Sequence, residues 1–126
     1  MANIRKPQDS ADAAAEAVRK FNHATLPTPR SRSGSLHYPG QACSSVAAFK
    51  RMAQYLPQSF DQTSGFLTRR HLEGTLTADC GLVADHVSDA KAALAEASRY
   101  ADLLAGALNR AHSALSPIGY SGEFED

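Results

Sequence analysis

The sequence predicts an all-α protein built on a long antiparallel helical hairpin. Residues 79–115 contain no proline, and their apolar residues recur at steps of three and four, as on one face of a helix. Residues 41–73 form a helical stretch of similar length, and the short segment "GTLTA" separates the two. Two long helices joined by a short connector pack against each other in opposite directions.

The second arm of the hairpin is the strongest helical segment. At 1.5 Å per residue, a helix over 79–115 would be about 55 Å long. Ser116-Pro117 ends it, because the residue before a proline disfavours the helical conformation. Its larger apolar residues are expected to form the core seam of the hairpin or a dimer seam: Val83, Val87, Leu94, Leu104 and Leu108.

The first arm contains a proline, Pro57, in its middle. A proline is tolerated in the first turn of a helix but kinks an interior, so 41–56 and 58–73 are either two helices or one bent helix. We expect one arm kinked at Pro57. Gly74 suits the end of this arm, because glycine adopts a positive φ without a Cβ clash.

A short N-terminal helix is expected over 9–24, with Ser10 or Asp9 accepting a hydrogen bond from its first turn. Residues 25–40 follow as a loop or strap that holds three of the six prolines. This segment is either mobile or ordered through Leu26, Leu36 and Tyr38. Residues 117–126 are expected to be a frayed acidic tail.

The composition indicates one small domain with a thin core. The chain has 126 residues, 43% of them hydrophobic, but alanine supplies many of these and there is no tryptophan. A buried alanine removes little apolar surface from water. We therefore expect a single domain over 1–126 whose helical bundle is completed by dimerisation.

The cellular compartment follows from what the sequence lacks. No stretch approaches the roughly 18 apolar residues of a membrane span, and the N-terminus has no apolar signal region. The two cysteines, Cys43 and Cys80, are too few for a disulfide framework and are expected to be reduced. These features favour a cytoplasmic protein that does not bind a membrane.

One stretch gathers residues of the kinds that bind zinc. "HLEGTLTADCGLVADH" (71–86) holds His71, Cys80 and His86, but a structural zinc site needs closely spaced ligand pairs, and gaps of nine and six residues do not supply them. We interpret the stretch as the bend of the hairpin, with Thr77 or Asp79 capping the second arm. Cys80 then serves as a small apolar residue at the helix entrance.

No sequence motif indicates catalysis or a cofactor. The chain lacks a P-loop, a dinucleotide-binding glycine motif and the H-E-x-x-H zinc motif. Paired acids such as Asp85 and Asp89 are typical of a solvated helix face. We therefore expect a non-enzymatic protein with no catalytic residue, cofactor or metal.

The charge is zero overall but unevenly distributed, with six basic and three acidic residues in 1–40. Basic residues could contact a protein partner or phosphate groups, although no helix-turn-helix spacing is present. The residues with this potential role are Arg5, Lys6, Arg19, Lys20, Arg30, Arg32, Arg69 and Arg70. An accessory nucleic-acid-binding role is therefore the alternative function, possible but not favoured.

Three phrases occur together in the chain: "AVRKFNHATL" (17–26), "YLPQSFDQ" (55–62) and "AALAEASRYADLLAGALNRAHSALS" (92–116). In this order they resemble a group of small, uncharacterised, alanine-rich helical proteins of actinobacteria, often encoded near mobile-element genes. The most distinctive pieces are "NHATLP" and "YLPQ". The resemblance implies a host type and a link to mobile elements, and it assigns no functional residue.

The sequence as a whole favours a non-enzymatic protein-interaction or accessory module, tied to a mobile genetic element. Its expected partners are a second copy of itself and another protein, which would bind to a helical face and to the 25–40 strap.

Overall fold

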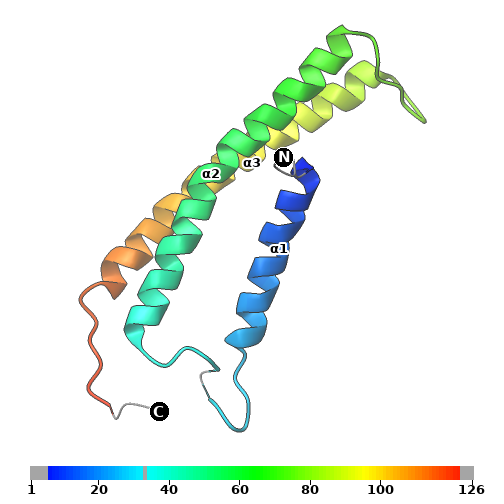
Figure 1. Cartoon of the computed structure of the whole chain (residues 1–126). Helices are drawn as coiled ribbons and strands as arrows, with labels where there is room; N and C mark the ends of the chain where they lie inside the picture. The colour runs from blue at the N-terminus through cyan, green and yellow to red at the C-terminus, as the bar shows by residue number, and fades with distance from the viewer. Residues whose placement is uncertain (1–5, 33, 123–126) are drawn as a thin grey trace, which may run out of the picture. The chain divides into compact units, whose positions relative to one another are not determined.

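A computed structural model describes residues 6–32 and 34–122 of the chain. It contains three helices, α1 (Pro7–Ala24), α2 (Pro39–Leu72) and α3 (Val83–Leu115), and no strand within the described residues (Figure 1). The predicted all-α class is confirmed. None of the helices in these ranges is both long and apolar enough to cross a membrane.

The chain divides into two compact units. The first consists of the residues up to Gln41 together with those from Gly119 onward, and the second runs from Ala42 to Ile118. The first unit holds α1 and the segment that follows it, and the second holds nearly all of α2 and all of α3.

Helix α1 begins two residues earlier than expected, and the predicted side-chain cap at Ser10 or Asp9 is wrong. Pro7 occupies the first turn and Lys6 is the N-cap, with no capping hydrogen bond from a side chain. Proline suits this place because its fixed φ is helical and its missing N–H would have no partner there. Asp9 instead lies in the first turn, where its charge complements the helix dipole.

The segment after α1 folds back on the end of that helix. The Thr25 hydroxyl donates to the Phe21 carbonyl at 2.9 Å, and the Ser35 N–H donates to the Ala24 carbonyl at 2.8 Å. Gly34 lies between them with φ 59°, and a Cβ there would stand 2.7 Å from the Ala24 oxygen, so only glycine fits. Leu26, one of the three residues through which this segment could be ordered, is 58% exposed.

An aromatic contact joins the two chain segments of the first unit. The rings of Tyr38 and Tyr120 meet edge to face, with their centroids 5.3 Å apart. Residues 123–126 of the expected frayed tail lie outside the described residues.

The side chain of Gln41 accepts hydrogen bonds from the backbone N–H groups of His37 and Tyr38, which satisfies donors at the start of α2.

Helix α2 is one continuous helix of 34 residues that includes Pro57. The two-helix alternative for this arm is therefore wrong. Proline removes one N–H from the hydrogen-bond ladder but keeps a helical φ, so a long helix continues through it when tertiary packing supports both sides. The packing that supports α2 comes from α3.

Helices α2 and α3 lie side by side and run in opposite directions (Figure 1). Near the start of α2, the Lys50 ammonium donates to the Asn109 side-chain oxygen near the end of α3, at 2.8 Å. At the opposite end, Leu67 of α2 and Val87 of α3 line the same pocket.

The contact between these helices buries very little. Among the described residues, only Ala53 of α2 and Ala101 of α3 are buried, at 1% and 5% exposure. Alanine lets two helices approach closely, but its burial contributes little free energy because it removes little apolar surface from water. The chain by itself therefore has a thin core, as its composition indicated.

Helix α3 begins at Val83, and the predicted caps Thr77 and Asp79 are wrong. Leu82 is the N-cap, without a side-chain capping bond. The reason is Gly81, whose φ of 69° breaks the helical path before the helix can begin. At its other end, α3 stops at Leu115, and the Ser116 hydroxyl donates to the His112 carbonyl.

The predicted seam residues fall in two groups. Val83, Val87, Leu94 and Leu108 are half-buried, whereas Leu104 is 48% exposed. At about 100° per residue, Leu104 lies about 60° from the direction of Ala101, while Ala105 lies about 40° from it. The seam therefore passes through Ala105, and Leu104 is left on the outer side of α3.

Candidate functional site

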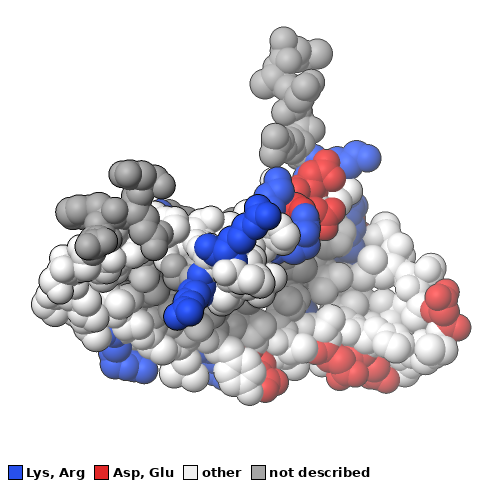
Figure 2. All heavy atoms as spheres, turned by 90° about the horizontal axis from the view of Figure 1, so that it is seen from below, with Lys and Arg blue, Asp and Glu red and all other residues white. Residues whose placement is uncertain are grey.

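The basic residues proposed as partner or phosphate contacts belong to both compact units of the chain. Arg5 lies outside the described residues. The others are exposed and are shared between the two units: Lys6, Arg19, Lys20, Arg30 and Arg32 in the first, and Arg69 and Arg70 in the second. Uncharged side chains make up most of the face in view in Figure 2.

Two of these arginines are paired with acids one helical turn away. Arg19 Nε donates to Glu16 at 2.9 Å, and this hydrogen bond lowers the pKa of Glu16 and raises that of Arg19. Arg70 pairs with Glu73 at 2.9 Å and also stacks over the Phe66 ring, 5.7 Å from its centroid. Pairing within the chain reduces the charge that these arginines could offer to a phosphate backbone.

The bend between α2 and α3 is the first candidate site, because it gathers the residues with chemical potential. The end of α2 forms a Schellman motif, in which the Gly74 N–H donates to the His71 carbonyl and the Thr75 N–H to the Arg70 carbonyl. Gly74 has φ 72°, as its predicted role as a helix stop requires. Residues 73–82 are not helical, so the stretch 71–86 contains the break between α2 and α3.

The start of α3 is fixed by a side chain that reaches back to the bend. His86 Nε2 lies 2.6 Å from the Cys80 carbonyl oxygen. A carbonyl can only accept, so Nε2 carries the hydrogen and donates. A Cβ at Gly81 would come within 3.2 Å of this nitrogen, so the glycine provides room for the contact. The His86 ring thereby closes the bend.

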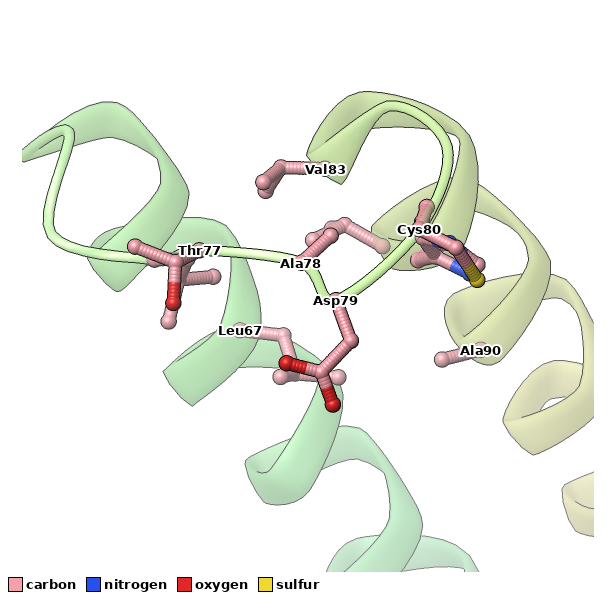
Figure 3. Close-up of a pocket in the computed structure, with 10 residues that line it drawn as sticks. Leu67, Thr77, Ala78, Asp79, Cys80, Val83 and Ala90 are labelled. Carbon is pink, nitrogen blue, oxygen red and sulfur yellow. Dashed lines mark hydrogen bonds between the residues drawn. The ribbon is translucent and has the colours of Figure 1, made fainter.

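An open pocket of about 420 Å³ lies between the bend and the two helices (Figure 3). Its walls are mainly apolar, with Leu67 from α2, Leu76 from the bend, and Val83, Val87 and Ala90 from α3. Figure 3 shows the Asp79 side chain reaching over this recess towards Leu67. The pocket can receive an apolar group, with one carboxylate at its edge.

The bend does not assemble a metal site or a catalytic dyad from the residues that suggested one. Among the described residues, no three His, Cys, Asp or Glu side chains lie close enough together to hold a metal ion. His86 is engaged with the Cys80 backbone rather than with the Cys80 thiol, which is free and exposed. Cys43 is also free and half-buried.

The second candidate site is an exposed apolar face on α3. Tyr100 and Leu103 are 60% and 70% exposed, and Leu104 is 48% exposed. Ala107 is also exposed and completes the pattern i, i+3, i+4 and i+7, which places all four side chains on one side of the helix. We call these four residues the α3 apolar face. A contiguous apolar stripe of this kind is typical of an interaction surface.

Charged groups stand at the two ends of the α3 apolar face. The Tyr100 hydroxyl donates to Glu96 at 2.7 Å, one turn before the face. Arg110 lies one turn after it and is exposed. The opposite side of α3 is polar, with Lys91, Asp102 and Asn109.

Sequence reasoning assigned the apolar residues of α3 to a single seam and missed this second face. The sequence did contain a signal for the second face, because the apolar residues of α3 cover more of the helix circumference than one seam occupies. Tyr100 and Leu103 fit no position in a stripe that runs through Ala97, Ala101 and Leu108, so they required a face of their own.

Comparison with protein-family models, with curated proteins and with solved structures gave no match. The geometry of the chain therefore carries the functional argument.

Proposed function

We propose that this protein is a non-enzymatic protein-interaction module that works as a homodimer, with the α3 apolar face as its interface. The helical pair of α2 and α3 serves as a scaffold that presents this face. In the dimer, two such pairs complete one bundle, as the thin core of the single chain requires. The predicted kink at Pro57 would bend the scaffold and remains part of this proposal.

The observation that carries the proposal is the imbalance between buried and exposed apolar residues. Two alanines are the buried residues of the described chain, while large side chains such as Tyr100 and Leu103 are more than half exposed. Fully burying an exposed leucine contributes about 1.5–3 kcal/mol. Association through the α3 apolar face would supply the burial that the chain lacks.

The bend supports the same proposal from the other end of the scaffold. Its hydrogen bonds fix the connection between α2 and α3, so the α3 apolar face is presented by a preorganised element. Preorganised surfaces bind more tightly because less conformational entropy is lost on association. The proposal also includes an accessory role in a mobile element, which the sequence resemblance implies. It includes a second, different protein partner, which would bind to the 25–40 strap.

The nucleic-acid alternative has no comparable support. Two of its cations are already paired with acids three residues away in the chain, and its residues are shared between both units. Such binding would weaken steeply with salt, so a gel-shift assay at low and high salt would reveal it.

The experiment that tests the proposal is light scattering coupled to size exclusion on the full chain. The wild type is expected to elute with twice the mass of one chain at tens of micromolar. The double variant Leu103→Gln/Leu104→Gln is expected to be a folded monomer, because it removes apolar surface from the interface and leaves the seam intact.

The matched control is Leu72→Gln at the end of α2. Leu72 is 81% exposed, more than either leucine of the double variant, but it lies outside the α3 apolar face. It is expected to remain a dimer. A monomeric wild type would refute the proposal, and so would a double variant that dimerises as well as the control.

A further inference from the structure

We propose that the two copies pair antiparallel through α3, about a two-fold axis that passes beside Leu103. This inference rests on the proposed dimer and adds its register and its charge pairs. It follows from the order of residues on the outer side of α3.

Three residues define a line along that side of the helix. Glu96, Leu103 and Arg110 follow each other at intervals of seven residues, which is close to two helical turns. A repeat of seven keeps side chains on the same side of a helix, as in a coiled-coil seam. The line therefore places an acid at one end, an apolar residue in the middle and a base at the other end.

An antiparallel two-fold arrangement makes this line complementary to itself. When Leu103 lies on the axis, each residue of this line faces the one at the same distance on the other side of Leu103 in the partner. Glu96 then faces Arg110 of the partner subunit, and Arg110 faces Glu96 of the partner subunit. Two ion pairs form, one at each end of the apolar contact.

The same register brings a large residue of the α3 apolar face to a small one. Tyr100 and Ala107 lie on the same side of the line through Leu103, and an antiparallel two-fold axis keeps residues of that side together. Tyr100 therefore lies beside Ala107 of the partner subunit, where the small side chain leaves room for a tyrosine ring.

The opposite orientation lacks these matches. In a parallel pair, Glu96 would face Glu96 of the partner subunit and Arg110 would face Arg110 of the partner subunit. Like charges placed together at an interface disfavour the complex. The hydrogen bond from Tyr100 also directs the Glu96 carboxylate along the face, and a carboxylate has further acceptor sites for a guanidinium.

Charge reversal provides the test. Glu96→Arg and Arg110→Glu each place like charges at both ends of the antiparallel contact, so each variant alone is expected to dimerise at least tenfold more weakly than the wild type. When the two variants are mixed, every Arg faces a Glu. The mixture is expected to form heterodimers, and the double variant Glu96→Arg/Arg110→Glu is expected to form homodimers again.

Native mass spectrometry of the mixture distinguishes the species, because the two single variants differ in mass. The matched control is Asp102→Arg, which reverses an exposed acid on the polar side of α3 and is expected to dimerise like the wild type. A random mixture of homodimers and heterodimers from the two single variants would overturn the register.

The outcomes separate this inference from the proposed function. A monomeric wild type removes both the proposed dimer and its register. A wild type and single variants that all dimerise equally, while Leu103→Gln/Leu104→Gln is monomeric, would keep the α3 apolar face as the interface and reject the antiparallel charge pairs.

Discussion

The side of α3 that contacts α2, its inner side, and the side that carries the α3 apolar face, its outer side, differ in the contacts that their side chains make within the chain. On the inner side, Ala101 packs against α2, and Asn109 accepts a hydrogen bond from Lys50 of α2. On the outer side, Tyr100 and Leu103 face solvent within a single chain. Both sides have helical spacing, so spacing alone does not tell which side is completed by the chain itself.

The difference indicates that the two sides of α3 serve different purposes. Alanines on the inner side allow close approach and a defined pair, but they bury little apolar surface. The larger apolar side chains, which could bury more, are placed where a second molecule can cover them. In the proposed dimer, contacts within the chain therefore fix the local geometry, and association supplies much of the hydrophobic stabilisation.

The largest loss of stability is expected for a substitution in the bend between α2 and α3. Gly81→Ala is expected to destabilise the protein by about 2–3 kcal/mol, because an L-residue at this positive φ is strained by about 1–2 kcal/mol and the lost hydrogen bond from His86 adds about 1 kcal/mol. Urea unfolding measures the change. A variant as stable as the wild type would show that the bend is not held as described.

How far the sequence predicts the fold can be judged at this bend. The helices and the stop at Gly74 were predictable, because apolar spacing and the φ freedom of glycine are local signals. The start of α3 was not, since it depends on Gly81 and on a side-chain contact to a backbone carbonyl. Asp79 has the chemistry of a cap but lies four residues before Val83.

Other elements depended on packing rather than on local signals. Pro57 allowed either two helices or one, and contact with α3 supports one. Leu104 followed the expected seam in a strict seven-residue repeat, but a straight helix drifts by about 20° per repeat, which moves the seam to Ala105. The α3 apolar face lay in the printed sequence and was overlooked because one seam was assumed.

Packing at the seam gives the next largest effect. Ala101→Leu adds volume where α3 contacts α2, and overpacking of this kind is expected to cost about 1–3 kcal/mol. Ala95→Leu, at an exposed position of the same helix, is the control and is expected to change stability by less than about 0.5 kcal/mol. Thermal unfolding followed by circular dichroism compares the two. Equal stability of both variants would mean that the seam is not closely packed.

A smaller loss is expected at the other glycine of the bend. Gly74→Ala should cost about 1 kcal/mol, because its φ of 72° strains any other residue while the space around it is open. In the same urea experiment, Gly74→Ala is expected to lower the free energy of unfolding by less than Gly81→Ala does. If Gly74→Ala were the more damaging of the two, the role given to His86 at Gly81 would be wrong.

The smallest effect is expected in the first compact unit, at the exposed pair in α1. Arg19 lowers the pKa of Glu16, so the pair stabilises the helix above the ordinary glutamate pKa of 4.5 and loses this contribution as the pH falls through the lowered value. Glu16→Gln should therefore reduce helicity slightly at neutral pH and leave it unchanged in acid. Circular dichroism at both pH values checks this, and a difference that grows in acid would contradict it.

The most direct test of the account is disulfide trapping at the proposed two-fold axis. In a chain with Cys43→Ser and Cys80→Ser, Leu103→Cys places a thiol next to the same thiol of the partner subunit, and Asp102→Cys places one on the polar side of α3. Under mild oxidation, we predict rapid formation of a covalent dimer for Leu103→Cys and little for Asp102→Cys. Equal and slow crosslinking of the two variants would show that no second copy covers this face.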